Sequence, residues 1–331
     1  MGAELLGRYP DLVAEARDIL GYAVDRLCLD DPDGLLGRTR WTQPALYVVS
    51  ALAYRAWCEE HEGPPDFAAG HSLGEYNALE AAGAFDFATG LRLVARRAEL
   101  MSRAPEGGMA VVVGLAADRV AGVLGDAGLD DVDIANHNTP TQYVISGPVR
   151  SLARAETWFG RAGARLYSRL NVSGPFHSRY MRQAERELAA HVRAAALSAP
   201  RFPVVSNVTA LPHGPDPSAC LLRQLSAPVR WTQSVRYLLA AGVTVFRQVG
   251  PGNALDAMVR DIRSAGSADP ADTVAPLVAH VERDLLRRLR EVARVPGPAP
   301  APDTDLGAYG IDLATLVGLS AELCAALGLD V

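Results

Sequence analysis

Residues 70–74 read Gly-His-Ser-Leu-Gly, the G-x-S-x-G pattern of a nucleophile elbow. A short apolar stretch over 66–69 precedes it and predicts a strand, and residues 73–82 predict a helix. Two glycines permit the cramped turn between them, which lifts the hydroxyl of Ser72 to the top of a sheet. The start of the helix faces developing negative charge, and the N–H of Leu73 can donate to an oxyanion. This stretch predicts an α/β fold built around a serine nucleophile.

A serine hydroxyl needs a base, and the sequence has seven histidines. His177 is the candidate because it follows Gly-Pro-Phe at a predicted loop-to-helix junction, where a side chain is both held and exposed. The competing interpretation is a histidine that only caps or packs the helix. No acidic residue stands out as a third member, so a backbone carbonyl could orient the base in a Ser–His dyad.

The other histidines are weaker candidates. His71 is expected to shape the elbow, and His137 lies in a predicted turn. The remaining four lie in polar or helical settings without a partner signal and are expected to be bystanders: His61, His191, His213 and His280.

The composition excludes several other chemistries. The 331 residues carry a formal net charge of −6, and all 32 basic side chains are arginines. Without lysine there is no Schiff-base aldolase, no pyridoxal-phosphate anchor and no Walker phosphate loop. The mild acidity, without a basic stripe and interleaved aromatics, argues against nucleic-acid binding.

The cysteine spacing and the hydropathy bear on metal binding, cellular location and membrane insertion. The four cysteines show no metal-ligand spacing, so we expect no metal and a reduced, cytoplasmic location. No apolar run reaches the length of about 18 to 20 residues that a membrane span needs, so no span is expected. The length predicts two domains, or one large domain with an insertion.

The pattern of apolar residues changes from helical spacing to mixed strand and helix signals near residue 107. Helical spacing dominates residues 3–60, with one helix predicted to open at Thr42, and it returns over 86–103. Residues 107–173 then give strand and helix signals in the order β-α-β-β-α-β, with a turn over 138–140 (Asn-Thr-Pro). That order is the split βαβ pattern, so we predict a ferredoxin-like small subdomain inserted in a larger α/β domain.

Beyond the insert the helical and strand signals alternate. A long helix is predicted over 177–197, strands over 203–208 and 243–249, and a further helix from Asn253. A proline-rich stretch follows and is a linker by composition. The predicted domains are a core of 1–106 and 174–294, the small subdomain 107–173, the linker 295–304 and a helical tail 305–331.

Several motifs occur together in one order along the chain. They are residues 70–79 (Gly-His-Ser-Leu-Gly-Glu-Tyr-Asn-Ala-Leu), Arg96-Arg97, 136–140 (Asn-His-Asn-Thr-Pro), 174–177 (Gly-Pro-Phe-His), 224–231 (Gln-Leu-Ser-Ala-Pro-Val-Arg-Trp) and 249–252 (Val-Gly-Pro-Gly). The set resembles malonyl-CoA:acyl carrier protein transacylases, and most of all the discrete, trans-acting acyltransferases of polyketide synthases. The similarity runs from residue 1 to about residue 293. It implies an α/β-hydrolase-like large subdomain with an inserted ferredoxin-like small subdomain.

The resemblance implies roles for the matched positions. Ser72 is expected to be the acylated nucleophile, His177 its base, and the backbone carbonyl of Gln224 the group that orients the imidazole. Leu73 keeps its role as oxyanion donor. Arg97 is expected to hold the free carboxylate of malonate in a bidentate pair, which lysine cannot form.

Further residues are expected to line the substrate site: His71, Phe176 and Asn138. Phe176 resembles the bulky residue that crowds an α-substituent, which favours malonyl over methylmalonyl groups. The competing interpretation of Arg97 is a solvated helix arginine, as we expect for its neighbours Arg92, Arg96 and Arg103.

The implied activity is that of an acyl-carrier-protein S-malonyltransferase in polyketide or fatty acid biosynthesis. Malonyl-CoA would be the substrate and an acyl carrier protein the partner, with no cofactor, nucleic acid or membrane. One alternative is an acyl hydrolase that clears carrier proteins, which would not need a carboxylate clamp. The other is an inactive, truncated remnant that only docks carriers.

The sequence departs from the family in several places. Relatives begin with a strand and a Pro-Gly-Gln-Gly-Ser-Gln loop that supplies a second oxyanion donor, whereas Met1-Gly2 resembles the end of that segment. We expect a misplaced start codon and an in-frame segment upstream. Pro175 stands where alanine is usual, and Gln248 where an acidic residue often stands. The tail looks like the approach to a phosphopantetheine site, but Leu313 replaces the required serine.

Overall fold

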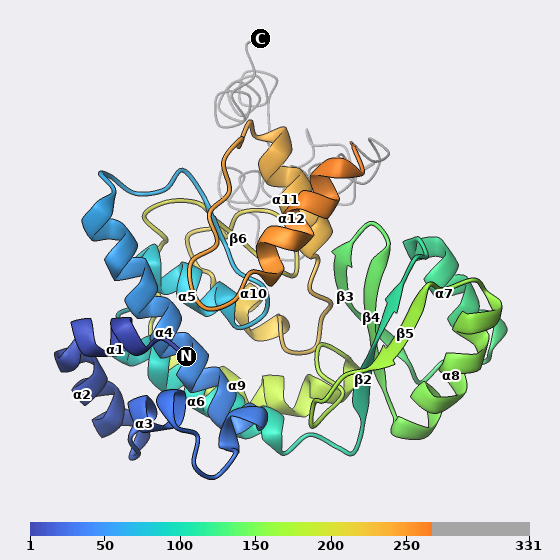
Figure 1. The fold of residues 1–331 in the computed structure, drawn as a ribbon, viewed down its shortest axis with the longest axis horizontal. Coiled ribbons are helices and arrows are strands. Elements are labelled where there is room, and N and C mark those ends of the chain that lie inside the picture. The colour runs from blue at the N-terminus through green and yellow to red at the C-terminus, as the bar shows by residue number, and fades with distance from the viewer. Residues whose placement is uncertain (267–331) are drawn as a thin grey trace, which may run out of the picture. The chain divides into compact units, whose positions relative to one another are not determined.

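The structure, a computed structural model, describes residues 1–266 of the chain. Helices come first: α1 (Ala3–Arg8), α2 (Pro10–Leu20), α3 (Val24–Leu29), the 3₁₀ turn η1 (Leu35–Gly37) and α4 (Thr39–Glu60) (Figure 1). The helical spacing of residues 3–60 predicted this region correctly. α4 begins ahead of the expected start at Thr42, because the N–H of Thr42 already bonds the carbonyl of Arg38 at 3.0 Å and closes the first turn.

A short parallel sheet carries the predicted elbow. β1 (Ala68–Ala69) pairs with β6 (Val204–Val205), and α5 (Gly74–Ala81) and α6 (Phe87–Ser102) follow the elbow. α6 packs along α4 (Figure 1). The carboxyl ends of parallel strands lie at one edge of a sheet, so the residues that follow β1 and β6 meet.

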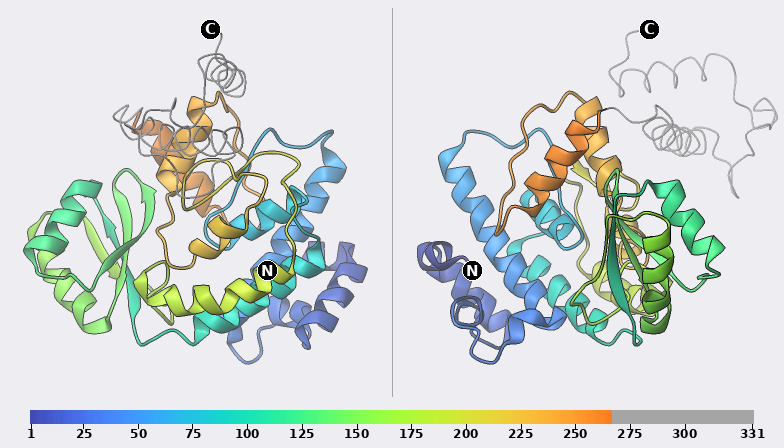
Figure 2. Two further views of the ribbon diagram at one scale, coloured as in Figure 1. Left: turned by 180° about the vertical axis from the view of Figure 1, so that it is seen from behind. Right: turned by 45° about the vertical axis from the view of Figure 1, so that its right-hand side comes forward.

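The second sheet has four strands, and two helices accompany it along the chain. Its elements are β2 (Gly108–Val113), α7 (Ala117–Asp126), β3 (Asp133–Thr139), β4 (Gln142–Gly147), α8 (Val149–Arg161) and β5 (Leu166–Arg169). The strand order is β3-β4-β2-β5 and every neighbouring pair is antiparallel. α7 and α8 lie on the same side of this sheet (Figure 2). The predicted turn over 138–140 is correct only at its end, because Asn138 and Thr139 still belong to β3, Thr139 pairs with Gln142, and the chain reverses at Pro140.

The last described part is mostly helical. It contains η2 (Arg179–Met181), α9 (Arg182–Ala194), α10 (Ser218–Arg223), α11 (Trp231–Ala240) and α12 (Ala254–Ser264). The predicted helix over 177–197 starts later than expected, because His177 has a φ of 54° and the backbone of Ser178 is extended. The predicted strand over 243–249 is wrong, since none of the described strands pairs with it and Val245 is 77% exposed.

Within residues 1–266, three apolar clusters form the core. The largest joins the N-terminal helices to α5, α6 and α9 through residues such as Leu52, Leu79 and Leu188. The second lies between the four-stranded sheet and α7 and α8, and the third joins α11 to α12. The part of the chain that the structure describes is therefore a mixed α/β fold with two sheets, and the predicted α/β class is confirmed.

Some predictions fall outside these residues. The linker 295–304, the tail 305–331 and His280 all lie beyond residue 266. Up to residue 266, no helix combines the length and apolarity that a membrane crossing requires. Within the same residues, the acidic, histidine and cysteine side chains form no cluster of three that could hold a metal ion.

Candidate active site

The turn over residues 70–74 connects β1 to α5 within a few residues. Ser72 at its centre has a φ of 52°, a conformation that costs a non-glycine residue about 1–3 kcal/mol. Gly70 is required by space, because a Cβ there would lie 1.9 Å from the backbone carbonyl carbon of Gly74. At Gly74 the same Cβ would meet nothing within 4 Å. The turn therefore depends on the first glycine of the motif and not on the second.

Asn207 holds the strained turn in place. Its Oδ1 accepts a hydrogen bond from the N–H of Ser72 at 2.7 Å, and its Nδ2 donates to the carbonyl of Gly70 at 2.7 Å. Asn207 is buried just after β6, the parallel partner of β1. The sequence analysis missed this residue. The available signal was the predicted strand over 203–208, whose end had to meet the elbow at the sheet edge.

His177 lies against the serine. Its Nε2 is 2.7 Å from Ser72 Oγ, and its Nδ1 is 2.9 Å from the backbone oxygen of Gln224. A carbonyl only accepts, so Nδ1 carries the hydrogen and the lone pair of Nε2 faces the serine hydroxyl. Burial, followed by the positive charge of Arg97, lowers the pKa of His177 to about 3. The imidazole is therefore neutral near pH 7, which is the state that can accept a proton.

Arg97 is a buried cation beside the same serine. It is 1% exposed, and its guanidinium donates to Gln43 Oε1 at 2.5 Å, to Ser72 Oγ at 3.0 Å and to Gln224 Oε1 at 3.0 Å. Its Nε has no hydrogen-bond partner, and no carboxylate of the described residues forms an ion pair with it. Neutral oxygens alone leave the charge of Arg97 uncompensated, so the site favours an anionic ligand.

α6 places its arginines in two different environments. The Arg97 guanidinium carbon lies 5.5 Å from the ring centroid of Tyr76, inside the protein. Arg96 and Arg103 both pair with Glu99, and Arg92 is exposed. The interpretation of Arg97 as a solvated helix arginine is therefore wrong.

A buried ion pair lies on the far side of Gln224. The Nε2 of Gln224 donates to Ser72 O at 2.8 Å and to Glu75 Oε2 at 2.5 Å, so its Oε1 is turned toward Arg97. His213 Nε2 lies 2.7 Å from Glu75 Oε1, and both side chains are 0% exposed. His213, expected to lie in a setting without a partner, therefore has a buried one. Its partner lies 138 positions away, and no pattern near His213 indicates it.

His71 links the elbow to the four-stranded sheet. Asn138 Nδ2 donates to Gln142 Oε1 at 3.1 Å, so its Oδ1 faces His71 Nε2 at 2.9 Å, and that nitrogen carries the hydrogen. Burial lowers the pKa of His71. Phe176 is 7% exposed and belongs to the largest apolar cluster. His71 and Asn138 are both expected to line the substrate site, and in the structure they form a hydrogen bond with each other.

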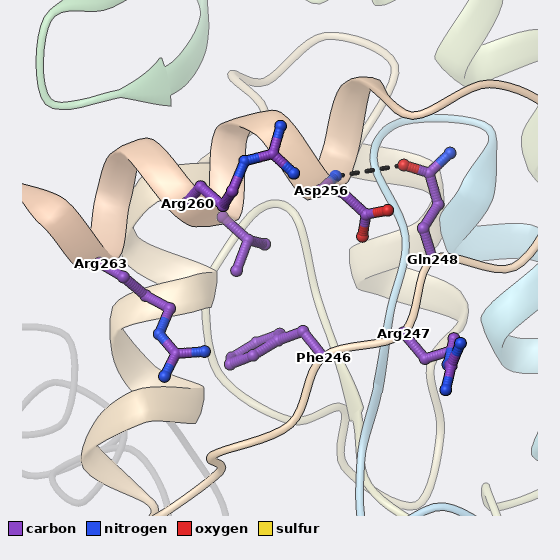
Figure 3. A pocket seen from close by; sticks show the side chains of 7 residues that line it. Phe246, Arg247, Gln248, Asp256, Arg260 and Arg263 are labelled. Carbon is purple, nitrogen blue, oxygen red and sulfur yellow. Dashed lines mark hydrogen bonds between the residues drawn. The ribbon is translucent and has the colours of Figure 1, made fainter.

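A separate hollow of about 290 Å³ lies beside α12 (Figure 3). Its walls include Phe246 and three arginines. None of the wall residues belongs to the serine cluster, which we define as Ser72, His177, Arg97 and Gln224. Gln248 closes one side, and its Oε1 accepts a hydrogen bond from Asp256 N at 3.2 Å (Figure 3). The same oxygen accepts a second hydrogen bond from Leu255 N at 3.0 Å. The glutamine found in place of an acidic residue therefore still caps the start of α12.

The serine cluster has the parts of an acyl-transfer site. A neutral base faces the serine hydroxyl, and the N–H of Leu73 lies at the start of α5, where helix N–H groups lack partners within the helix. A buried cation lies 3.0 Å from the serine oxygen. These groups fit an ester or thioester whose acyl group carries a carboxylate.

Comparison with known proteins agrees with this chemistry. Residues 1–297 match the model of the acyl transferase domain family. Over 274 residues, or 82% of the chain, it is 49% identical to the polyketide biosynthesis protein ThaF of Burkholderia thailandensis, and the match spans only 24% of ThaF. It is 46% identical over 273 residues to the polyketide biosynthesis malonyl CoA-acyl carrier protein transacylase BaeC of Bacillus velezensis, covering 82% of this chain and 94% of BaeC.

A solved structure is similar to most of the chain. The malonyl CoA-acyl carrier protein transacylase of Burkholderia pseudomallei superposes with a TM-score of 0.79 and 50% identity. The match covers 81% of this chain and 94% of that one.

Proposed function

The chain belongs to the acyl transferase domain family, and we propose that it moves a malonyl group from malonyl-CoA to the phosphopantetheine thiol of an acyl carrier protein. One observation carries this proposal: the buried Arg97 lies 3.0 Å from the Oγ of Ser72, which in turn faces a neutral histidine. A nucleophile beside a carboxylate receptor suits an acyl group that ends in a carboxylate. The names of BaeC and of the Burkholderia pseudomallei transacylase support the same activity.

The first half-reaction loads the enzyme. Ser72 Oγ attacks the thioester carbonyl of malonyl-CoA while His177 Nε2 accepts the hydroxyl proton. The carbonyl of Gln224 holds the imidazole, and the N–H of Leu73 stabilises the negative oxygen of the tetrahedral intermediate. The C–S bond then breaks, His177 gives its proton to the departing thiolate, and the malonyl group remains on Ser72 as an ester.

The second half-reaction runs the same steps toward a new thiol. His177 accepts the proton of the carrier's phosphopantetheine thiol, and the sulfur attacks the ester carbonyl. The C–O bond to Ser72 breaks, and Ser72 Oγ regains a proton from His177. The side chains and the two substrates supply every group in this scheme, so we propose no cofactor.

Three contacts are proposed to select the acyl group. Arg97 pairs with the malonyl carboxylate, using the Nε that has no partner and a terminal nitrogen. Phe176 restricts an α-substituent, by about 1–3 kcal/mol for one methyl group. His71 and Asn138 line the substrate site and keep their mutual hydrogen bond.

The finer fold assignment is also a proposal. We assign residues 107–173 to a ferredoxin-like subdomain, supported by the order β3-β4-β2-β5 with two helices on one side. The strand, the strained serine and the following helix support an α/β-hydrolase-like core over 1–106 and 174–294. The names of ThaF and BaeC support a place in polyketide biosynthesis, with fatty acid biosynthesis as the other source of carriers. A cytoplasmic location stays a prediction.

A transfer assay tests the proposed function. The purified chain is incubated with radiolabelled malonyl-CoA and an acyl carrier protein bearing phosphopantetheine, and the label is followed on the carrier and in solution. We expect label on the carrier, and none on a carrier without phosphopantetheine. Release of free malonate without labelled carrier would indicate the acyl hydrolase instead. No consumption of malonyl-CoA would contradict both activities and leave the carrier-docking remnant.

A further inference from the structure

The ion pair of His213 and Glu75 lies directly behind the groups that face the substrate. Glu75 Oε1 is 2.7 Å from His213 Nε2, and Glu75 Oε2 is 2.5 Å from the amide nitrogen of Gln224. The other end of the same amide contacts Arg97 at 3.0 Å. One glutamine side chain is thus all that separates the carboxylate of Glu75 from the guanidinium of Arg97.

The charges of Glu75 and Arg97 determine the net charge that a substrate meets in this site. Glu75 is 0% exposed and Arg97 is 1% exposed, so little solvent screens one from the other. Glu75 acts electrostatically on Arg97 and raises its pKa against the larger, lowering effect of burial. Without a second cation, Glu75 would offset the charge of Arg97. A substrate carboxylate would then meet a site with no net charge.

His213 supplies that second cation. Burial lowers the pKa of His213, but the neighbouring side chains of Cys220 and Glu75 outweigh burial and raise it to about 9. The contact that carries this effect is the one with Glu75 at 2.7 Å, since His213 Nδ1 has no hydrogen-bond partner. The imidazole is therefore protonated at neutral pH. With His177 neutral, the buried groups of Arg97, Glu75 and His213 together carry one positive charge.

We propose that His213 is a specificity-determining positioning residue: by neutralising Glu75, it leaves the charge of Arg97 available to an acyl thioester that carries a carboxylate. The inference rests on the proposed function and adds to it a residue that touches neither substrate nor serine. It also assigns a role to Glu75, whose carboxylate can only accept. Glu75 therefore fixes the Nε2 side of the Gln224 amide toward itself and the Oε1 side toward Arg97.

The test compares a charged with an uncharged acyl group. Single-turnover loading of the full chain is measured over a range of malonyl-CoA and acetyl-CoA concentrations. His213→Gln removes the charge but keeps a donor for Glu75. We expect its half-saturating malonyl-CoA concentration to rise about tenfold relative to that for acetyl-CoA, the size of one buried charge acting across the site. The matched control is His191→Gln, which changes an exposed histidine of α9 and should keep the wild-type ratio.

A second variant separates charge from folding. Glu75→Gln combined with His213→Gln removes both charges of the pair and leaves Arg97 as the single cation, so the malonyl preference should return to within about threefold of wild type. Equal losses for both substrates in His213→Gln, or a double variant no better than the single one, would overturn the role of His213 while the proposed function stands. A wild-type chain that malonyl-CoA does not load would overturn the proposed function and this inference with it.

Discussion

We propose that substrate choice depends on Arg97. Its guanidinium is buried among neutral oxygens of Gln43, Ser72 and Gln224, and its Nε has no partner. Burying a cation in this way is unfavourable, because hydrogen bonds to neutral groups only partly replace the water that is lost. Under the proposed function, a malonyl carboxylate would supply the missing counter-charge, so that substrate binding would also relieve this cost.

Removing the guanidinium should separate charged from uncharged substrates. Arg97→Ala should weaken loading by malonyl-CoA at least about 30-fold, since loss of one partner of a buried charge pair costs about 2 kcal/mol or more. Loading by acetyl-CoA, which has no carboxylate, should be spared. Arg97→Lys should give an intermediate loss, because an ammonium is a point charge and cannot make the two-pronged pair. Intact-protein mass spectrometry after timed loading measures all three; equal losses with both substrates would count against this role.

The lowered pKa of His177 predicts how stability and the acylation rate depend on pH. Its pKa of about 3 in the folded chain lies below the usual 6.5, so the unfolded chain takes up a proton first as the pH falls. The fold should therefore lose stability as the pH falls from 6.5 toward 3, while the base stays neutral and the acylation rate stays level down to about pH 5. Arg97→Gln removes a charge that lowers this pKa, so the acid limb should move to higher pH. A wild-type limb near pH 6.5 in single-turnover rates would contradict the assignment.

Sequence reasoning predicted the residues that carry local motifs. Ser72 was marked by its flanking glycines, and His177 and Arg97 by motifs that occur in a fixed order. Glu75 stands inside the same motif, yet nothing in the sequence indicates that its carboxylate is fully buried. His213 and Asn207 were missed for the same physical reason: their partners are brought near only by the pairing of β1 with β6 and the loop that follows.

At the scale of elements, the elbow over residues 70–74 is the part of the fold that tolerates substitution least. β1 ends at Ala69 and α5 begins at Gly74, so the chain must reverse within four residues while it holds Ser72 at a φ of 52°. Asn207 stabilises this turn from the neighbouring strand with two hydrogen bonds. The sheet is short, but it determines which side chains meet the serine.

The two glycines of the motif should respond differently to alanine. Gly70→Ala puts a Cβ at 1.9 Å from backbone, so the elbow cannot close and the chain should lose its cooperative thermal unfolding transition. Gly74→Ala meets no atom within 4 Å and removes a glycine from the start of a helix, so stability should be unchanged or rise by up to about 1 kcal/mol. Thermal unfolding followed by circular dichroism compares them. A Gly70→Ala chain as stable as the Gly74→Ala chain would contradict the steric argument.

Element predictions failed where pairing or backbone strain decided the outcome. The apolar residues of 243–249 favour a strand, but a strand also needs a partner, and none of the described strands pairs with them. The helical spacing after His177 is real, yet the positive φ at His177 delays the helix to Arg182, with a 3₁₀ turn before it. Hydrophobic periodicity predicts the type of an element well and its ends poorly, because caps and strained residues set the ends.

For the molecule as a whole, the serine site joins two sheets. The elbow follows the parallel pair β1 and β6, while Asn138 on β3 of the four-stranded sheet bonds His71 beside the serine. Backbone hydrogen bonds between β3 and the segment before α11 reinforce this link: Val229 N donates to Ala135 O at 2.8 Å and His137 N to Val229 O at 2.9 Å. The site therefore depends on residues from distant parts of the chain, and five of the six ordered motifs supply a residue to it.

The acyl-enzyme is the central claim, and its direct test is the mass of the protein after brief exposure to malonyl-CoA. The wild-type chain should gain the mass of one malonyl group, and fragmentation of the active-site peptide should locate that mass on Ser72. Ser72→Ala, which leaves the strained turn and Arg97 in place, should gain nothing. The same adduct on Ser72→Ala, or a wild-type adduct located on another residue, would contradict the account.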